Sequence, residues 1–189
     1  HYPLRRQRQM CIRDRLSKLQ REGKKTRLFI KLSSATIADA DFLPWLRDRV
    51  NTLKLDADSL VFEISEESAL NFLKQAKALI SGLNELHCRT TLEGFGLEQN
   101  TFQSLKHLKV NYIKVHMKLI HGLAQNVEHQ EKVKAVAEHA NGLNIQTIAP
   151  FVEDANSLAV LWQCAVDFIQ GYFLQQPNTE MNYDFEEGI

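Results

Sequence analysis

The sequence predicts an α/β fold built on a parallel sheet, and three observations lead to this prediction. Short runs of branched and aromatic residues, typical of strands, alternate with longer runs that have the apolar spacing of helices. Several strand–helix units follow one another, which favours a barrel over an open sheet. Polar residues recur at the carboxyl ends of the expected strands, where parallel folds bind their ligands.

Composition fits one globular domain. A chain of 189 residues with 44% hydrophobic content can bury one sizeable core. Cys11, Cys88 and Cys164 lie far apart, with no metal-ligand spacing, so we expect reduced thiols in a cytoplasmic protein. The longest apolar region, Ser157 to Ile169, is too short to cross a bilayer, so no membrane segment is expected in this chain.

The two ends differ from the rest of the chain. Residues 1–15 include Arg5 to Asp14, a run similar to a peptide that recurs when sequencing-adapter DNA is translated in environmental gene fragments. We therefore predict a non-native leader, with a disordered basic arm as the alternative, and we expect no nucleic acid polymer as partner. Residues 178–189 are expected to form a flexible C-terminal tail.

The first half of the chain predicts a helix end and three strands with their helices. Leu16 to Glu22 has the character of the last turns of a helix that stops at Gly23. The expected strands are Arg27 to Ser33, Leu60 to Ile64 and Thr90 to Leu92; the expected helices are Asp39 to Val50 and a segment with Leu70, Leu73, Ala76, Leu79, Ile80 and Leu83 on one face.

The second half continues the alternation. Helices are expected over Thr101 to Leu108, Glu131 to Ala140 and Glu153 to Cys164, and strands over Asn111 to His116, Ile145 to Val152 and Asp167 to Gly171. About six strands are too few for an eight-stranded closure. Either the sheet is open or two strands are missing at the start, and the foreign-looking leader favours the second explanation. Such a barrel would have two unpaired edges and poor stability.

One acidic residue lies where a strand gives way to a glycine-rich turn, in Thr90 to Gly96. Glu93 follows the branched residues of the strand, and Gly94 and Gly96 permit backbone angles closed to other residues. Glu93 is therefore either a residue of a site at the carboxyl end of the sheet or a solvated turn acid.

Polar groups from the other strands converge on the same rim. Each has a simpler interpretation: Glu66 as a helix first-turn acid, His116 as a turn histidine, Lys114 as a surface lysine. Together they favour a site, because solvation alone does not require every strand to deliver a polar group to one end. The set comprises Lys31, Ser33, Glu63, Glu66, Glu93, Lys114, His116, Glu153, Gln170 and Tyr172.

The order of these motifs resembles the EAL domain, a barrel that binds and usually hydrolyses the bacterial second messenger cyclic di-GMP. The resemblance covers residues 16–177 and implies a TIM-like (β/α) barrel of the EAL type, incomplete and truncated at its N-terminus. It rests on Ile30 to Ser33, Glu63 to Glu66, Glu93 to Gly96, Ile113 to His116, Ala149 to Glu153, and Gln170 to Tyr172 with Pro177.

The departures from the family pattern imply a domain without catalysis. Active members hold two divalent cations through several carboxylates. Here the Glu-Ala-Leu strand is absent, and Lys31, Gly94, His116 and Pro150 stand where the family has ligands. No metal or other cofactor is therefore expected. The residual family positions, Glu63, Glu93, Lys114 and Glu153, are not expected to function in catalysis.

Among EAL domains, the pattern is most similar to FimX-like degenerate receptors. That similarity implies cyclic di-GMP as ligand, a PilZ-type adaptor that controls type IV pili as partner, and an upstream GGDEF domain. The implied ligand-binding residues are Lys31, Lys114, Phe151 and Gln170, with core packing as the alternative for Phe151.

Two other functions remain open. The chain could be a weak phosphodiesterase that uses Mg²⁺ or Mn²⁺ and hydrolyses cyclic di-GMP to pGpG. It could also be a purely structural or partner-binding domain.

Overall fold

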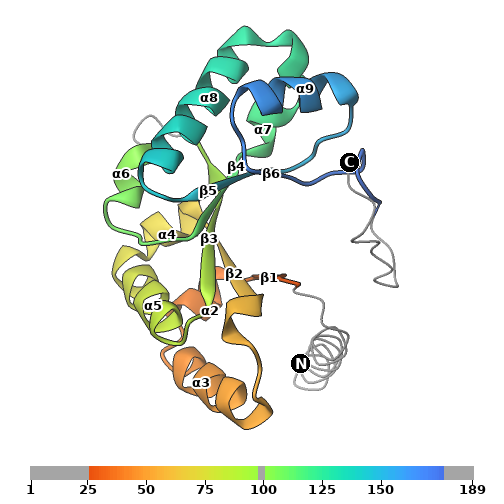
Figure 1. The fold of residues 1–189 in the computed structure, drawn as a ribbon. Helices are drawn as coiled ribbons and strands as arrows, with labels where there is room; N and C mark the ends of the chain where they lie inside the picture. The colour runs from red at the N-terminus through yellow and green to blue at the C-terminus, as the bar shows by residue number, and fades with distance from the viewer. Residues whose placement is uncertain (1–25, 98–100, 177–189) are drawn as a thin grey trace.

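The computed structural model describes residues 26–97 and 101–176. Within them, six parallel strands form one sheet in chain order, and the sheet curves into half of a barrel (Figure 1). This confirms the incomplete TIM-like barrel, with β1 and β6 as the edges of the described sheet. The strands are β1 (Leu28–Lys31), β2 (Leu60–Ser65), β3 (Arg89–Phe95), β4 (Tyr112–Val115), β5 (Gln146–Ala149) and β6 (Phe168–Ile169).

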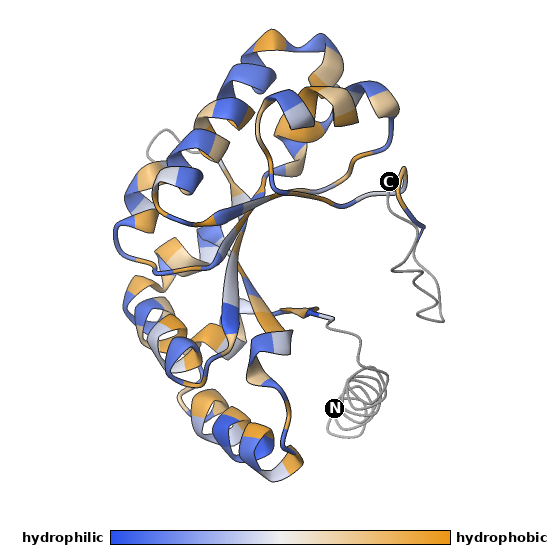
Figure 2. Ribbon diagram, viewed as in Figure 1, coloured by the Kyte–Doolittle hydropathy of each residue, from blue (hydrophilic) through white to orange (hydrophobic). Residues whose placement is uncertain are grey.

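The helices lie on the convex side of the sheet and leave its concave side open (Figure 1). Apolar and polar residues share each long helix (Figure 2), as expected for helices with one covered face. Outward-facing strand residues such as Phe62, Leu92 and Ile113 pack against them in the main core. The helices are α2 (Ser34–Ala38), α3 (Phe42–Leu53), α4 (Glu66–Asn71), α5 (Leu73–Glu85), α6 (Thr101–Leu105), α7 (Met117–Ile120), α8 (Val127–Gly142) and α9 (Ala155–Gln163), with short 3₁₀ turns η1 (Ala57–Ser59) and η2 (Leu123–Gln125).

Several boundaries differ from the prediction for local reasons. The single helix expected after β2 is two, because Phe72 leaves helical geometry between α4 and α5. The next-to-last expected helix begins earlier, at Val127, where the Asn126 side chain accepts a hydrogen bond from the His129 amide. α9 begins later than predicted because Asp154 caps it through the Ser157 amide.

Two short helices were not predicted. α2 follows β1 and is capped by Ser33, whereas α7 follows β4 and is capped by His116. Both are too short to show an apolar period. The predictions for the leader 1–15, the helix end at 16–22 and the tail 178–189 concern residues outside the described ranges.

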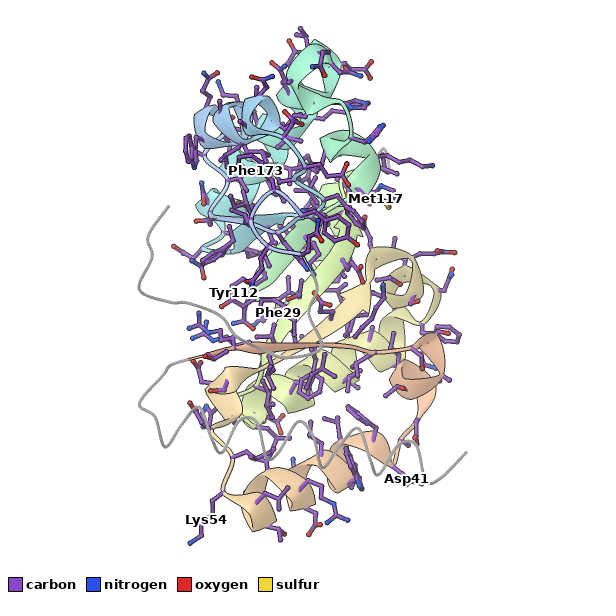
Figure 3. The ribbon with its side chains drawn as sticks, turned by 90° about the vertical axis from the view of Figure 1, so that its right-hand side faces the viewer. Phe29, Asp41, Lys54, Tyr112, Met117 and Phe173 are labelled. Atoms are coloured by element: carbon purple, nitrogen blue, oxygen red, sulfur yellow. The ribbon has the colours of Figure 1, made fainter. Side chains whose placement is uncertain are left out.

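The concave face of the sheet begins with an apolar layer. Val61, Tyr112 and Ile148 form a buried cluster of their own. Phe29 lies beside Tyr112 with ring centroids 5.8 Å apart, as the view onto the open side shows (Figure 3), and the Phe168 ring lies 6.3 Å from Tyr112 on the other side. These five residues come from five strands and form the floor on which the polar residues of the next layer lie.

No helix in residues 26–97 and 101–176 is long and apolar enough to cross a membrane.

Candidate functional site

A polar layer lies above the apolar floor. Successive strand residues point to opposite faces of a sheet, so the residue two positions after each floor residue also faces the concave side. Following Phe29, Val61, Tyr112 and Phe168, this rule gives Lys31, Glu63, Lys114 and Gln170. The carboxyl end of the half-barrel therefore carries charges of both signs.

Lys114 and Glu63 form a buried ion pair. Both residues are less than a tenth exposed, and the Lys114 ammonium donates to Glu63 Oε1. The same ammonium lies 5.5 Å from the centroid of the Phe29 ring, which adds a cation–π contact. The interpretation of Lys114 as a surface lysine is therefore wrong.

Lys31 and Glu93 form a second ion pair nearer solvent. Lys31 Nζ lies 2.9 Å from Glu93 Oε2, and the two side chains are 66% and 27% exposed. Glu93 lies near the carboxyl end of β3, as predicted, but the strand continues past it to Phe95 through a bulge at Gly94 with φ of 78°. Glu93 is therefore a paired residue of the site and not a solvated turn acid.

Glu66 connects two helices. It is the first residue of α4, after the Ser65 cap, as the first-turn interpretation held, but it is buried. The hydroxyls of Thr101 and Ser104 donate to its Oε1 at 2.8 and 3.1 Å. These bonds tie α4 to α6 beside the site.

His116 is fixed by a cap. Its Nδ1 accepts a hydrogen bond from the Lys118 amide at 3.1 Å. Burial and, to a smaller extent, the Lys118 charge lower the pKa of His116 below its usual 6.5. The shift favours the neutral imidazole, whose Nδ1 remains an acceptor for the Lys118 amide.

The segment after β5 exposes an aromatic ring. β5 ends at Ala149, earlier than predicted, because Pro150 has no amide hydrogen for the sheet. Phe151 follows in left-handed geometry, with φ of 59°, and is 54% exposed. Core packing, the alternative interpretation of Phe151, is therefore wrong.

One pocket of about 530 Å³ collects most of the predicted residues. Ser33 is not among its lining residues, because it caps α2. Met117, half exposed, and Gly171 also line the pocket and were not proposed as site residues. The predicted residues that line it are Lys31, Glu63, Glu66, Glu93, Lys114, His116, Phe151, Glu153, Gln170 and Tyr172.

The pocket does not suit a pair of divalent cations. Glu63 and Glu93 each already hold a lysine ammonium, which repels a cation. Gly94 and Pro150 bring no side-chain oxygen. Across the described ranges, no three side chains of the His, Cys, Asp and Glu types are arranged to hold a metal ion.

Comparison with known families gives one match over most of the chain. The family described as EAL domain matches residues 7–177. Among curated proteins, the cyclic di-GMP phosphodiesterase PdeF of Escherichia coli K12 is 24% identical over 151 residues, which is 80% of this chain and 20% of PdeF. The chain spans about a fifth of the length of the curated relatives it matches.

Solved structures with the same fold include FimX EAL domains. One crystal structure of a FimX EAL domain is 42% identical, with a TM-score of 0.87 over 92% of this chain and 69% of that one. The FimX EAL domain of Pseudomonas aeruginosa bound to cyclic di-GMP is 41% identical, with a TM-score of 0.85 over 94% and 72% of the two chains. The FimX EAL domain of Xanthomonas citri, also in complex with cyclic di-GMP, is 26% identical, with a TM-score of 0.87 over 92% and 69%.

Proposed function

Because this chain belongs to the EAL domain family, we propose that it is a non-catalytic module of a bacterial cyclic di-GMP signalling protein and acts as a receptor for the messenger. The observation that carries this proposal is the pair of lysines, Lys31 and Lys114, at the carboxyl end of the half-barrel, which we call its mouth. Lys31 and Lys114 neutralise Glu63 and Glu93, the carboxylates that a dinuclear metal site would need.

A lysine at the rim of the pocket can also bind a phosphate. Lys31 is 66% exposed at its side chain, so its ammonium can turn from Glu93 to a phosphate oxygen without losing buried contacts. Lys114 remains paired with Glu63 at the base of the pocket, so Lys31 is the lysine that can contact a phosphate. Cyclic di-GMP carries two phosphodiester groups with one negative charge each, and Lys31 at the rim can donate to one of them.

The exposed ring of Phe151 supplies the contact for a guanine base. Stacking of a base on an aromatic side chain contributes about 1–3 kcal/mol. Gln170 lines the same pocket and offers an amide that both donates and accepts hydrogen bonds. The FimX EAL domains of Pseudomonas aeruginosa and Xanthomonas citri were solved with cyclic di-GMP, which supports the same ligand here.

The experiment is a calorimetric titration of this chain with cyclic di-GMP in the presence and absence of Mg²⁺. We expect binding that is unchanged by excess EDTA, because no cation takes part. Lys31→Met is expected to weaken binding and Lys132→Met, on the remote helix α8, to leave it unchanged. Binding that requires Mg²⁺ or Mn²⁺ contradicts the proposal.

A weak phosphodiesterase is the second candidate, because Glu63, Glu93, Lys114 and Glu153 all line one pocket. The discriminating measurement is release of pGpG by the natural protein with excess Mg²⁺ or Mn²⁺. We expect none above the rate of a Lys114→Ala variant whose folding has been checked by circular dichroism. Turnover that this substitution abolishes establishes the enzyme.

We place the whole protein in the cytoplasm, with a GGDEF domain upstream and a PilZ-type adaptor of type IV pili as its partner. The support is the similarity of this chain to solved FimX EAL domains. Co-purification of the natural protein with a PilZ-type adaptor, tested with and without cyclic di-GMP, checks the partner.

A further inference from the structure

Gly171 lies against the main chain of Val152 at the rim of the pocket. A Cβ on Gly171 would overlap the carbonyl oxygen and nitrogen of Val152 and come within 2.7 Å of its carbonyl carbon. Gly171 does not have the positive φ of Gly94 or Gly96. Glycine is needed here because two backbones touch, not because of an unusual backbone angle.

At this close approach, both the amide and the carbonyl group of Val152 form hydrogen bonds. The Val152 amide donates to the Gln170 carbonyl at 3.0 Å, and the Phe173 amide donates to the Val152 carbonyl at 3.1 Å. The Gln170 amide in turn donates to the Ala149 carbonyl at 2.8 Å, which continues the pairing of β5 with β6 beyond the strands. Val152 itself is fully buried.

The neighbour of this anchored residue is the exposed Phe151. A bulky aromatic residue at φ of 59° is an outlier, because left-handed geometry brings its Cβ close to the backbone. Its ring gains little from burial, since the residue is 54% exposed. The conformation of Phe151 must therefore be imposed by its neighbours, and the next residue, Val152, is held by two backbone hydrogen bonds to the segment after β6.

The result is a ring held over the pocket before any ligand arrives. Phe151 and Tyr172 flank Val152 and Gly171 in the two segments, and both line the pocket together with Glu153 and Gln170. Tyr172 is 61% exposed. An exposed aromatic ring in a backbone conformation fixed by its neighbours loses little freedom when a flat ligand stacks on it.

We propose that the contact between Gly171 and Val152 presets Phe151 as the stacking surface for a purine base, which makes Gly171 a positioning residue of the site. This inference rests on the proposed binding of cyclic di-GMP. It adds that the affinity for cyclic di-GMP depends on Gly171, which has no side chain with which to contact the ligand. It also explains why β5 and β6 remain paired past their ends, at the segments that carry the two rings.

The test compares three single variants of this protein and the double variant Gly171→Ala/Phe151→Asn. Gly171→Ala adds the Cβ that the contact excludes. Gly142→Ala is the matched control, because a Cβ there meets nothing within 4 Å, and Gly142 also lacks a positive φ. Phe151→Asn removes the ring but keeps a residue that tolerates left-handed geometry. Each is measured for binding of cyclic di-GMP by calorimetry and for amide hydrogen exchange.

We expect Gly171→Ala and Phe151→Asn each to raise the Kd for cyclic di-GMP about tenfold or more. The double variant should be no weaker than the worse single variant by more than about twofold, because both changes remove the same stacking. Gly171→Ala should also lose the exchange protection of the Val152 and Phe173 amides. Phe151→Asn and Gly142→Ala should keep that protection.

Other outcomes overturn the inference in distinct ways. Wild-type affinity in Gly171→Ala, or losses in the two single variants that multiply in the double variant, shows that Gly171 does not act through Phe151. Unprotected Val152 and Phe173 amides in the wild type show that the contact is absent, even if Gly171→Ala fails to fold. A wild-type protein that does not bind cyclic di-GMP overturns the proposed function and the stacking role together, whereas amide exchange still tests the contact.

Discussion

The two ion pairs of the mouth are built from the same kinds of group, yet they differ in what they can do. The side chains of Lys114 and Glu63 are 9% and 10% exposed, whereas the side chain of Lys31 in the other pair is 66% exposed. Removing a partner from a buried pair leaves a charge without water, while an exposed charge is solvated at once. Loss of one partner should therefore cost much stability in the first pair and little in the second.

The pairs also cross the register of the sheet. Lys31 is the lateral neighbour of Glu63, and Glu93 is the lateral neighbour of Lys114. Each lysine nevertheless contacts the carboxylate one strand further away, so both ion pairs pass over an intervening strand. Curvature of the sheet brings alternate strands together on the concave side, as it does in closed barrels.

Breaking the buried pair should have the largest effect. Lys114→Ala leaves Glu63 buried without its counter-charge, and we expect a loss of about 3–5 kcal/mol in the free energy of unfolding. Urea unfolding followed by circular dichroism measures this. The double variant Glu63→Leu/Lys114→Met removes both charges and is expected to be more stable than Lys114→Ala. A double variant as unstable as Lys114→Ala would show that burial of the charge is not the cause.

Breaking the exposed pair should separate binding from stability. Lys31→Met is expected to change the free energy of unfolding by less than about 1 kcal/mol. The same substitution should raise the Kd for cyclic di-GMP about tenfold, because it removes a charge-assisted contact with phosphate. Urea unfolding and calorimetry on one preparation check both values. A stability loss equal to that of Lys114→Ala would abolish the distinction between the pairs.

A third group at the mouth, His116, should give a pH dependence. Its pKa is lowered in the folded state, so the unfolded chain takes up a proton first as the pH falls. Stability from this group is fully present above pH 6.5 and is lost as the pH falls from there through the lower, folded pKa. His116→Asn keeps a capping side chain and should remove this part of the decline, which thermal melts between pH 5 and pH 8 would measure. Identical pH profiles for the two proteins would exclude His116 as the source.

Salt should produce the smallest effect and should sharpen the contrast. The coupling energy between Lys31 and Glu93, taken from a double-mutant cycle, is expected to be about 0.2–1 kcal/mol at low salt and to approach zero at about 1 M NaCl. The coupling between Lys114 and Glu63 should persist, because little solvent reaches that pair. Equal salt sensitivity of the two couplings would mean that both pairs are solvated.

Local sequence patterns predicted much of the fold. The alternation of strand and helix runs predicted six strands, and the structure contains all six in chain order. The second expected strand, Leu60 to Ile64, differs from β2 by one residue. β2 extends to Ser65, where the Ser65 side chain caps the following helix. The errors came where a single side chain decides a boundary, as Asn126 and Asp154 do at the starts of α8 and α9.

The site was predictable as a set of residues and not as a set of contacts. Glu63, Lys114 and Gln170 could be placed on one rim because each occupies a known offset from a strand end. Glu66 belongs to the same rim but is engaged with α6, a partner 35 residues away that no local pattern indicates. Gly171 was visible within Gln-Gly-Tyr, yet its contact with Val152 was not, because two segments must be seen side by side.

By itself, the sequence determined which face of each strand its residues occupy, because the period of two is a local property of an extended backbone. It also determined which residues stand at the carboxyl ends of the strands, among them Lys31, Gly94 and Pro150. Only the tertiary structure decided which lysine meets which carboxylate, how deeply each pair is buried, and that Phe151 is exposed. Those outcomes depend on the curvature of the sheet and on contacts between distant segments, which no local periodicity specifies.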